Sequence, residues 1–227
     1  MTHPYWPIFD LRISAPPLEL RPMNEADQAV IAELLPDDVE LHPAATRYDV
    51  ASERIGRGIV VHQGYWKAYG TWKPEAWRLS FVVLAAGAPI GVQELEGNDF
   101  VRLRTVDTSS FLVPAVRGLG HGKRMRQAVL SLAFGPLDAQ AAITSAWQDN
   151  HASLGVSRSL GYRPNGEMLH RRDDGVDVMV HLRLTRESWL ASQRSAGIAV
   201  SGFEPCRPLF GLASPTARAR ASTVGHR

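Results

Sequence analysis

Three short segments between residues 78 and 113 alternate apolar and polar side chains with a period of two, and this pattern restricts the possible folds to those that contain a sheet. The segments are 78–85, 90–97 and 106–113, separated by a tight turn around Gly87 and Pro89 and by a polar connection over 98–104. Such alternation is typical of strands with one buried face. Because the connections are short, we expect an antiparallel meander.

The segments around the meander predict helices packed against one mixed sheet, an α+β fold. Asn24 is a suitable N-cap for a helix that Pro36 ends. The turn Asp173-Asp174-Gly175 is expected to join two further strands. The other expected elements are strands at 18–23, 141–147, 162–172 and 176–184, and helices within 52–68, 123–134 and about 151–160.

The ends of the chain lack this periodicity. We expect an N-terminal arm over 1–17, one domain over 18–190, a strap or edge strand within 191–212 and a disordered tail over 213–227. An edge strand near 198–210 would also suit a homodimer. The aromatic cluster over 65–77 has two interpretations, a packed core edge or a wall of a substrate pocket.

Composition excludes several classes of function. The 227 residues hold 25 Lys and Arg against 23 Asp and Glu, and a net charge of +2 is too small to indicate nucleic-acid binding. Cys206 is the one cysteine, the eight histidines lack zinc-ligand spacing, and no signal peptide or membrane-spanning run is visible. The expectation is a cytoplasmic protein without a metal, a nucleic-acid partner or a membrane partner.

The stretch Arg117-Gly118-Leu119-Gly120-His121-Gly122-Lys123 separates the last meander strand from an amphipathic helix. Glycines before a helix let several backbone N–H groups converge on one anion, and the helix dipole and the flanking cations favour it. The stretch therefore predicts a pyrophosphate site. A P-loop is excluded, because Arg117 stands where its first glycine is needed and Arg124 where its hydroxyl is needed. A dinucleotide fingerprint is also missing.

The spacing of Arg117, Gly120 and Gly122 fits R/Q-x-x-G-x-G/A, and in this respect the chain resembles the GNAT acyltransferase superfamily. Asn150-His151-Ala152-Ser153 and Ser159-Leu160-Gly161-Tyr162 resemble a second segment of that family, and the resemblance covers about 18–190. The Asn-x-x-Ser form is most similar to the ribosomal-protein N-terminal acetyltransferase-like branch. The resemblance implies a sheet splayed between the strands at 106–113 and 141–147, with the third meander strand ending in a bulge.

The resemblance also implies acetyl-CoA as co-substrate and an amine as acceptor. Pantetheine would meet the backbone of Phe111, Leu112 and Val113, and Asn150 as well. The pyrophosphate would lie on the N–H groups of 118–123 beside Arg117, and Ser153 would lie near the thioester. In direct transfer, a base removes a proton from the amine and backbone N–H groups polarise the carbonyl.

Three residues are candidates for catalysis. Glu94 and Asp107 are alternatives for the general base, since each lies on the polar face of its strand, and a water relay without one essential base is a third possibility. Many relatives protonate the thiolate with a tyrosine seven residues after the asparagine, but this chain has Ser157 there. Ser153 is the remaining candidate donor, with helix capping as its other role. Loss of the tyrosine also leaves open a non-catalytic acyl-CoA-binding domain, and the sequence does not identify the acceptor.

Overall fold

The computed structural model describes residues 3–40, 45–46, 48–172, 175–192 and 194–213. Nine strands form the fold: β1 (Arg12–Ala15), β2 (Leu18–Pro22), β3 (Trp77–Ala85), β4 (Ala88–Gly97), β5 (Thr105–Leu112), β6 (Ala141–Trp147), β7 (Arg163–Arg172), β8 (Gly175–Thr185) and β9 (Ala199–Ser201). They lie in one sheet in the order β7-β8-β6-β5-β4-β3-β2-β1-β9. Every neighbouring pair is antiparallel except β5 and β6. The sheet confirms the predicted α+β class and the predicted meander.

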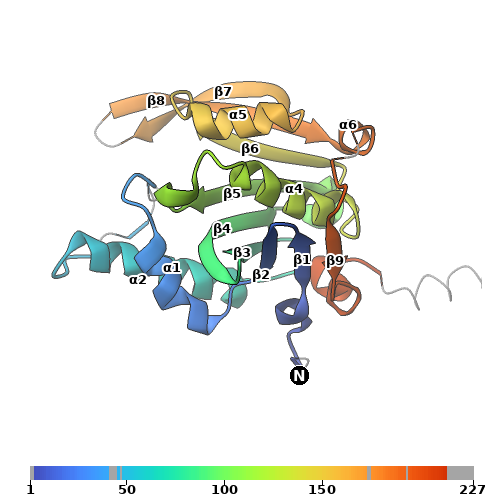
Figure 1. Cartoon of the computed structure of the whole chain (residues 1–227), viewed down its shortest axis with the longest axis horizontal. Helices are drawn as coiled ribbons and strands as arrows, with labels where there is room; N and C mark the ends of the chain where they lie inside the picture. The colour runs from blue at the N-terminus through green and yellow to red at the C-terminus, as the bar shows by residue number, and fades with distance from the viewer. Residues whose placement is uncertain (1–2, 41–44, 47, 173–174, 193, 214–227) are drawn as a thin grey trace, which may run out of the picture.

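Helices cover both faces of this sheet (Figure 1). The α-helices are α1 (Gln28–Leu34), α2 (Glu53–Gly70), α3 (Phe100–Leu103), α4 (His121–Phe134), α5 (His151–Ser159) and α6 (Arg186–Leu190). Short 3-10 helices are η1 (Pro7–Asp10), η2 (Glu25–Asp27), η3 (Pro114–Val116) and η4 (Glu204–Phe210). None of the helices among the described residues has the length and apolarity needed to span a membrane.

The two faces hold two separate hydrophobic clusters. The larger cluster packs α4, α5 and α6 against one face, with residues such as Met125, Leu132 and Phe134 fully or nearly fully buried. The smaller cluster, around Met23, Ile31, Val82 and Val92, lies on the other face beneath α1 and α2. The pleat explains the separation, because successive residues of each strand point to opposite faces.

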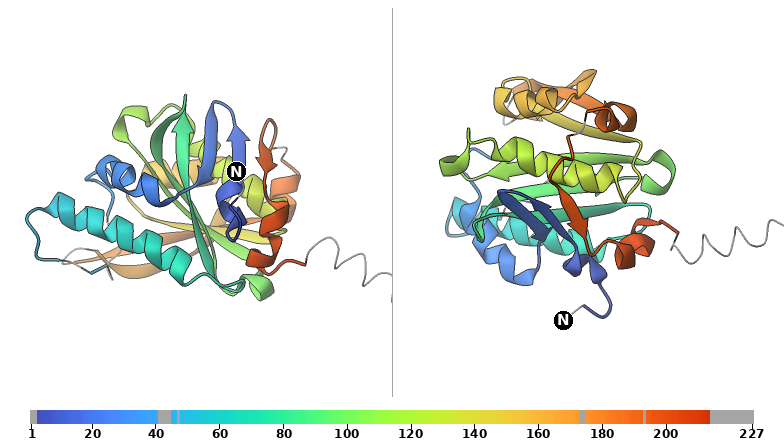
Figure 2. Two further views of the ribbon diagram at one scale, coloured as in Figure 1. Left: turned by 90° about the horizontal axis from the view of Figure 1, so that it is seen from below. Right: turned by 45° about the vertical axis from the view of Figure 1, so that its right-hand side comes forward.

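The expected N-terminal arm contributes a strand to the sheet. β1 pairs with β2, with Ile13 opposite Leu20, and β9 pairs with the other side of β1. Figures 1 and 2 show β9 beside β1, so segments from opposite ends of the chain complete this edge of the sheet. Four residues of β1 are too few to give a clear period-two signal in the sequence. Dimerisation through 198–210 stays a prediction, and the predicted tail lies mostly outside the described residues.

The connection at 98–104 differs from the predicted polar loop. Residues 100–103 form α3, and Phe100 at its start is fully buried against Trp77, with ring centroids 5.2 Å apart. The flanking Asp99 and Arg104 both take the left-handed conformation, with φ of 48° and 47°. One buried aromatic residue therefore anchors a connection whose other side chains are mostly exposed.

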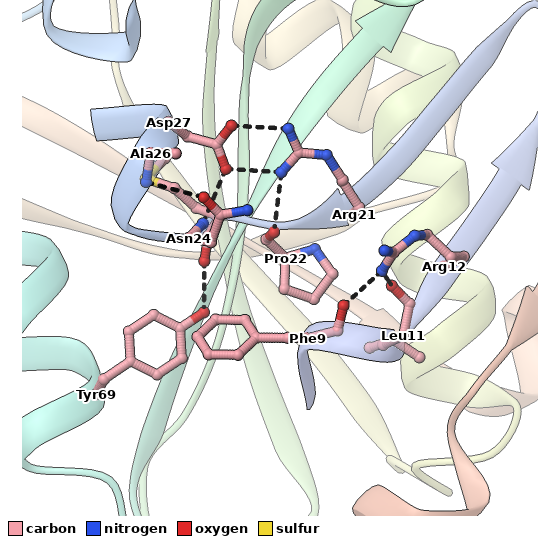
Figure 3. Close-up of polar contacts among 10 residues, drawn as sticks. Phe9, Leu11, Arg12, Arg21, Pro22, Asn24, Ala26, Asp27 and Tyr69 are labelled. Carbon is pink, nitrogen blue, oxygen red and sulfur yellow. Dashed lines mark hydrogen bonds and ion pairs between the residues drawn. The ribbon is translucent and has the colours of Figure 1, made fainter. Parts of the chain in front are cut away.

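The first helical segment begins where the sequence predicts it. Asn24 Oδ1 accepts from Ala26 N at 2.9 Å, and the Asp27 carboxylate accepts from Asn24 N at 2.8 Å. Asp27 also binds both terminal nitrogens of Arg21, at 2.6 and 2.7 Å (Figure 3). Tyr69 Oη donates to Met23 O at 2.9 Å, which ties the end of α2 to the end of β2.

The aromatic cluster packs as a core edge. The Trp72 ring lies 5.9 Å from that of Trp77 and 5.3 Å from that of Phe210, and Trp72 Nε1 donates to Leu209 O at 2.8 Å. Trp66 is 53% exposed and stays outside this packing. The packed rings fasten the C-terminal η4 to the end of α2.

Candidate functional site

The sheet separates at the centre, as the resemblance implies. β5 and β6 are paired only over Thr105–Asp107 and Ala141–Ile143. Beyond those positions β5 stays paired with β4 to Leu112, and β6 stays paired with β8 to Trp147. Within the described residues, the two strands therefore each have an edge without a strand partner, facing a gap that we call the splay.

The alternation of hydrogen bonds along β5 decides which backbone groups face the splay. Val113 N donates to Ile90 O at 3.0 Å, so Val113 faces β4. Leu112 O accepts from Arg117 Nε at 3.0 Å and Thr108 O accepts from Thr144 Oγ1 at 2.9 Å, so these residues face away from β4. The antiparallel pattern then directs the N–H and C=O groups of Ser110 and Leu112 into the splay.

This pattern refines the predicted contacts of Phe111, Leu112 and Val113. Leu112 presents backbone groups to the splay, whereas Phe111 and Val113 present theirs to β4. Ser110, which was not among the predicted contacts, is the second residue whose backbone groups face the splay. The pairing of β4 with β5 is regular from Glu96–Asp107 to Gly91–Leu112. The expected bulge is therefore missing from β5, and the register shift lies between β3 and β4, near Val83 and Leu84.

The glycine stretch forms the predicted turn into α4. Gly118 and Gly120 have φ of +77° and +84°, where a side chain would be strained, and a Cβ at either would meet open space. Gly120 is the N-cap of α4, and no side chain of the described residues caps this end. Arg124 N makes the first bond within the helix, to Gly120 O at 3.1 Å, so the N–H groups before it are available to an anion.

Arg117 lies at the mouth of this turn and holds two partners. Its Nε is bound to Leu112 O, and its two terminal nitrogens bind the Asp38 carboxylate at 2.5 and 2.9 Å. The side chains of Arg117 and Asp38 are 39% and 62% exposed. The Arg117 guanidinium lowers the pKa of the Asp38 carboxyl. Asp38, from the connection between α1 and α2, thus binds the terminal nitrogens of Arg117, the residue that the sequence analysis placed beside the pyrophosphate.

Three elements meet at Gly122. A Cβ built there would lie 3.7 Å from Val156 of α5 and 3.8 Å from Leu112 of β5. The start of α4, the end of β5 and the body of α5 are therefore in contact. His121 and Lys123 flank this point, and Leu119 is 67% exposed at the tip of the turn. The stretch from 117 to 123 thus lies at the open end of the splay.

Asn150 and Ser153 lie together at the start of α5. Asn150 Oδ1 accepts from Ser153 N at 3.0 Å, so Asn150 caps the helix and Ser153 occupies its first turn. Ser157, one turn further on, is 1% exposed and donates to Ser153 O at 3.0 Å. The capping role considered for Ser153 therefore belongs to Asn150.

The carboxylates lie on the opposite face of the sheet, the face beneath α1 and α2. Glu94 accepts from Ser80 Oγ at 2.8 Å and from Ser109 Oγ at 2.7 Å. Asp107 Oδ1 accepts from Thr108 N at 2.6 Å. Burial raises the pKa of the Asp107 carboxyl above its ordinary value. Strand alternation therefore groups the two predicted bases on one face, and the splay separates them from Ser153.

Further charged groups lie on this face, and the sequence analysis assigned no role to them. Arg78 pairs with Glu96 at 2.9 Å, and burial, followed by the charges of Glu94 and Asp107, raises the pKa of Glu96. His181 of β8 is close enough for its charge to act on Asp107, and its Nε2 is buried without a hydrogen-bond partner among the described residues. Alternation within 176–184 is a signal that could have placed His181 on this face, but only the pairing of β8 with β6 brings it near β5.

Solved structures of acetyltransferases share this fold. Mycobacterium smegmatis RimJ in complex with CoA-disulfide is 15% identical, with a TM-score of 0.63 over 83% of this chain and 97% of that one. A putative acetyltransferase from T. thermophilus is 17% identical, with a TM-score of 0.61 over 82% and 95%. A spermidine N-acetyltransferase SpeG mutant from Vibrio cholerae is 14% identical, with a TM-score of 0.61 over 77% and 98%. At these identities the likeness shows the fold.

The family of this chain is shown by a match between its sequence and a family model. A family model described as an acetyltransferase (GNAT) domain matches residues 17–163, which is well over half of the chain. The match spans β2 to the start of β7, and therefore includes the meander, the glycine stretch, the splay and α5. This chain belongs to the GNAT acetyltransferase family.

Proposed function

We propose that this protein transfers an acetyl group from acetyl-CoA to a primary amine by direct attack within a ternary complex. The observation that carries the proposal is the splay between β5 and β6, which opens beside the uncapped start of α4 and has carboxylates on its far side. A slot, an anion site and a set of proton acceptors are what a thioester and an amine need in order to meet.

The co-substrate is proposed to bind along the exposed edge of β5. Its pyrophosphate would accept hydrogen bonds from the backbone of 118–123 and face Arg117. Its pantetheine arm would run past Leu112 and Ser110, whose backbone groups face the splay rather than a strand partner. Asn150 and Ser153 would line the α5 side of the same slot. When bound, acetyl-CoA supplies an activated acyl carbon, and these residues orient it.

Asp107 is the proposed general base. One of its oxygens is fixed by Thr108 N, and burial moves the pKa of the carboxyl upward, toward the range in which a base accepts a proton efficiently. Glu94 is proposed to hold the incoming ammonium group, since two hydroxyl donors fix its carboxylate in place. Ser153 stays a proposed donor to the leaving sulfur.

The charge of this face supports a cationic acceptor. Of the groups described on this face, the carboxyls of Glu94, Glu96 and Asp107 outnumber the guanidinium of Arg78 and the imidazole of His181. A surface with this excess attracts an ammonium group and orients it toward the sheet. We therefore propose an amine that is protonated in solution, without naming one molecule.

A thiol-release assay tests the proposal. Acetyl-CoA would be offered with peptides bearing free N-termini, polyamines and aminoglycosides, and turnover should depend on the amine. Asp107→Asn should lower kcat by roughly 10²- to 10⁴-fold, and Glu94→Gln should mainly raise KM for the amine. Glu167→Gln, at an exposed position of β7, is the matched control.

The missing tyrosine favours one other function, a non-catalytic acyl-CoA-binding domain, because Ser157 cannot replace a tyrosine hydroxyl from its buried position. CoA binding by calorimetry without amine-dependent thiol release across the panel would support that alternative. An absence of both binding and release would contradict the acyl-CoA site itself.

A further inference from the structure

A cluster of buried polar side chains lies between α4 and the sheet, in the middle of the larger hydrophobic core. Its members come from β4, β5, α4, β6 and the connection that follows α5, and each is at most 4% exposed: Gln93, Thr108, Arg126, Thr144 and Tyr162. Burying polar groups at this depth is costly unless each has a partner. The cluster therefore calls for a structural or functional explanation.

Arg126 spans the splay. Its Nη1 donates to Thr144 Oγ1 of β6 and its Nη2 to Ser110 Oγ of β5, both at 3.4 Å. Both hydroxyls lie beyond the last paired positions of these strands, Asp107 and Ile143. The guanidinium thus lies where the two strands have already separated, below the backbone groups of Ser110 that face the gap.

Three atoms of the cluster lack a hydrogen-bond partner among the described residues, namely Gln93 Oε1, Arg126 Nε and Tyr162 Oη. Burial raises the pKa of the Tyr162 hydroxyl and the charge of Arg126 lowers it, so the guanidinium lies near Tyr162 Oη. In the described part of the chain no carboxylate lies within ion-pair distance of Arg126. The bonds of its terminal nitrogens go to neutral hydroxyls at the long limit for a hydrogen bond.

An uncompensated buried cation is expensive, so a position that keeps one needs a compensating anion. The splay between β5 and β6 opens beside this guanidinium. In the binding mode proposed above, the acyl end of the pantetheine arm would lie at the level of Ser110. The anion that would satisfy Arg126 is therefore one that forms at that end during the reaction.

We infer that Arg126 is a catalytic residue that stabilises the thiolate leaving acetyl-CoA; the inference rests on the proposed acetyl transfer. The bound ammonium group first gives one proton to solvent through the carboxylates of the opposite face. The neutral amine nitrogen then forms a bond to the thioester carbon and loses a second proton, and the C–S bond breaks with its electron pair leaving on sulfur. The proton lost by the nitrogen goes to the base on the opposite face. The sulfur leaves as an anion beside the guanidinium, which provides the charge stabilisation that Ser157 cannot provide.

The thiol of bound CoA reports this interaction directly. An adjacent cation lowers the pKa of a thiol, typically by 1–3 units, relative to about 8.5 for a cysteine-like reference. The other titratable groups that act near the guanidinium are Tyr162 and, through its charge, Asp107. The experiment is an ultraviolet titration of the thiolate in the complex of the full chain with CoA.

The variants are Arg126→Met and Arg126→Lys, with Arg158→Met at an exposed position of α5 as the matched control. In the wild-type complex the thiol should titrate at least about one unit below free CoA, which means roughly tenfold more thiolate at a given pH. Arg126→Met should restore the free value and lower kcat by about 10²- to 10³-fold with little change in CoA affinity. Arg126→Lys, which keeps a charge, should fall between the two.

A normal thiol pKa in the wild-type complex would overturn the inference whatever the variants do, and so would a lowered pKa that persists in folded Arg126→Met. Both results leave acetyl transfer intact, because amine-dependent turnover is measured separately. Absence of CoA binding by the wild-type chain would instead contradict the proposed function itself.

Discussion

Asp38→Asn should tighten the binding of CoA, although it removes an ion pair from the protein. Asp38 binds the two terminal nitrogens of Arg117 at 2.5 and 2.9 Å, while Nε is held by Leu112 O. A pyrophosphate at the start of α4 needs the same two nitrogens. The carboxylate therefore competes with the ligand, and it also repels the ligand as a like charge.

The expected size of the effect follows from the exposure of the pair. The side chains are 39% and 62% exposed, so the ion pair is screened and is worth only about 0.2–1 kcal/mol. If that free energy is lost when CoA binds, its removal in advance should improve affinity by about 1.4- to 5-fold. The gain should shrink as salt is raised, because the competing interaction is screened.

Isothermal titration calorimetry with CoA measures this effect in a double-mutant cycle. Arg117→Met should weaken binding, and Asp38→Asn in the Arg117→Met background should then have much less effect than in the wild type. Weaker binding by Asp38→Asn, or an equal gain with and without Arg117, would refute the competition between Asp38 and the ligand.

Three further predictions concern the cradle, the base and the fold. Gly120→Glu should weaken CoA binding more than about tenfold by calorimetry while the domain stays folded, because a carboxylate would enter an open anion site. Gly166→Glu, also at a positive φ with open space, controls for backbone strain. Unchanged CoA affinity in Gly120→Glu would argue against a pyrophosphate site at the start of α4. The pKa of Asp107 is higher in the folded protein than its unfolded value near 3.8, so the ionised carboxyl costs stability as pH rises from the unfolded to the folded pKa. The Tm of Asp107→Asn minus the Tm of wild type should therefore be more positive near neutral pH than below pH 3.8. A difference in Tm that does not change with pH would contradict this. Tyr69→Phe should lower the free energy of unfolding by about 0.5–1.5 kcal/mol in denaturant titrations, because Met23 O loses its hydrogen-bond donor. Tyr5→Phe, at a residue 87% exposed, should have no effect on this free energy. Equal stability of the two variants would contradict the role of the Tyr69 hydrogen bond.

Local patterns predicted most of the elements of this fold. The period of two over 78–97, the cap at Asn24 and the glycines before α4 each specify conformation through neighbours in sequence, and each appears in the structure. β1 and α3 were missed, because four-residue elements carry too few side chains to show a period and depend on pairing or on one buried ring. The missing bulge in β5 was an expectation from resemblance rather than from the residues.

The family, the meander and the glycine turn could all be predicted from the residues alone, since motif spacing and side-chain alternation are properties of contiguous residues. The groups that meet at the splay became known only from the folded chain. Ser110 faces the splay, Asp38 binds Arg117, and Arg126 of α4 is buried beneath the splay. These contacts join residues up to 79 positions apart. Burial and the loss of strand pairing depend on how the whole sheet assembles, and no window of the sequence contains that information.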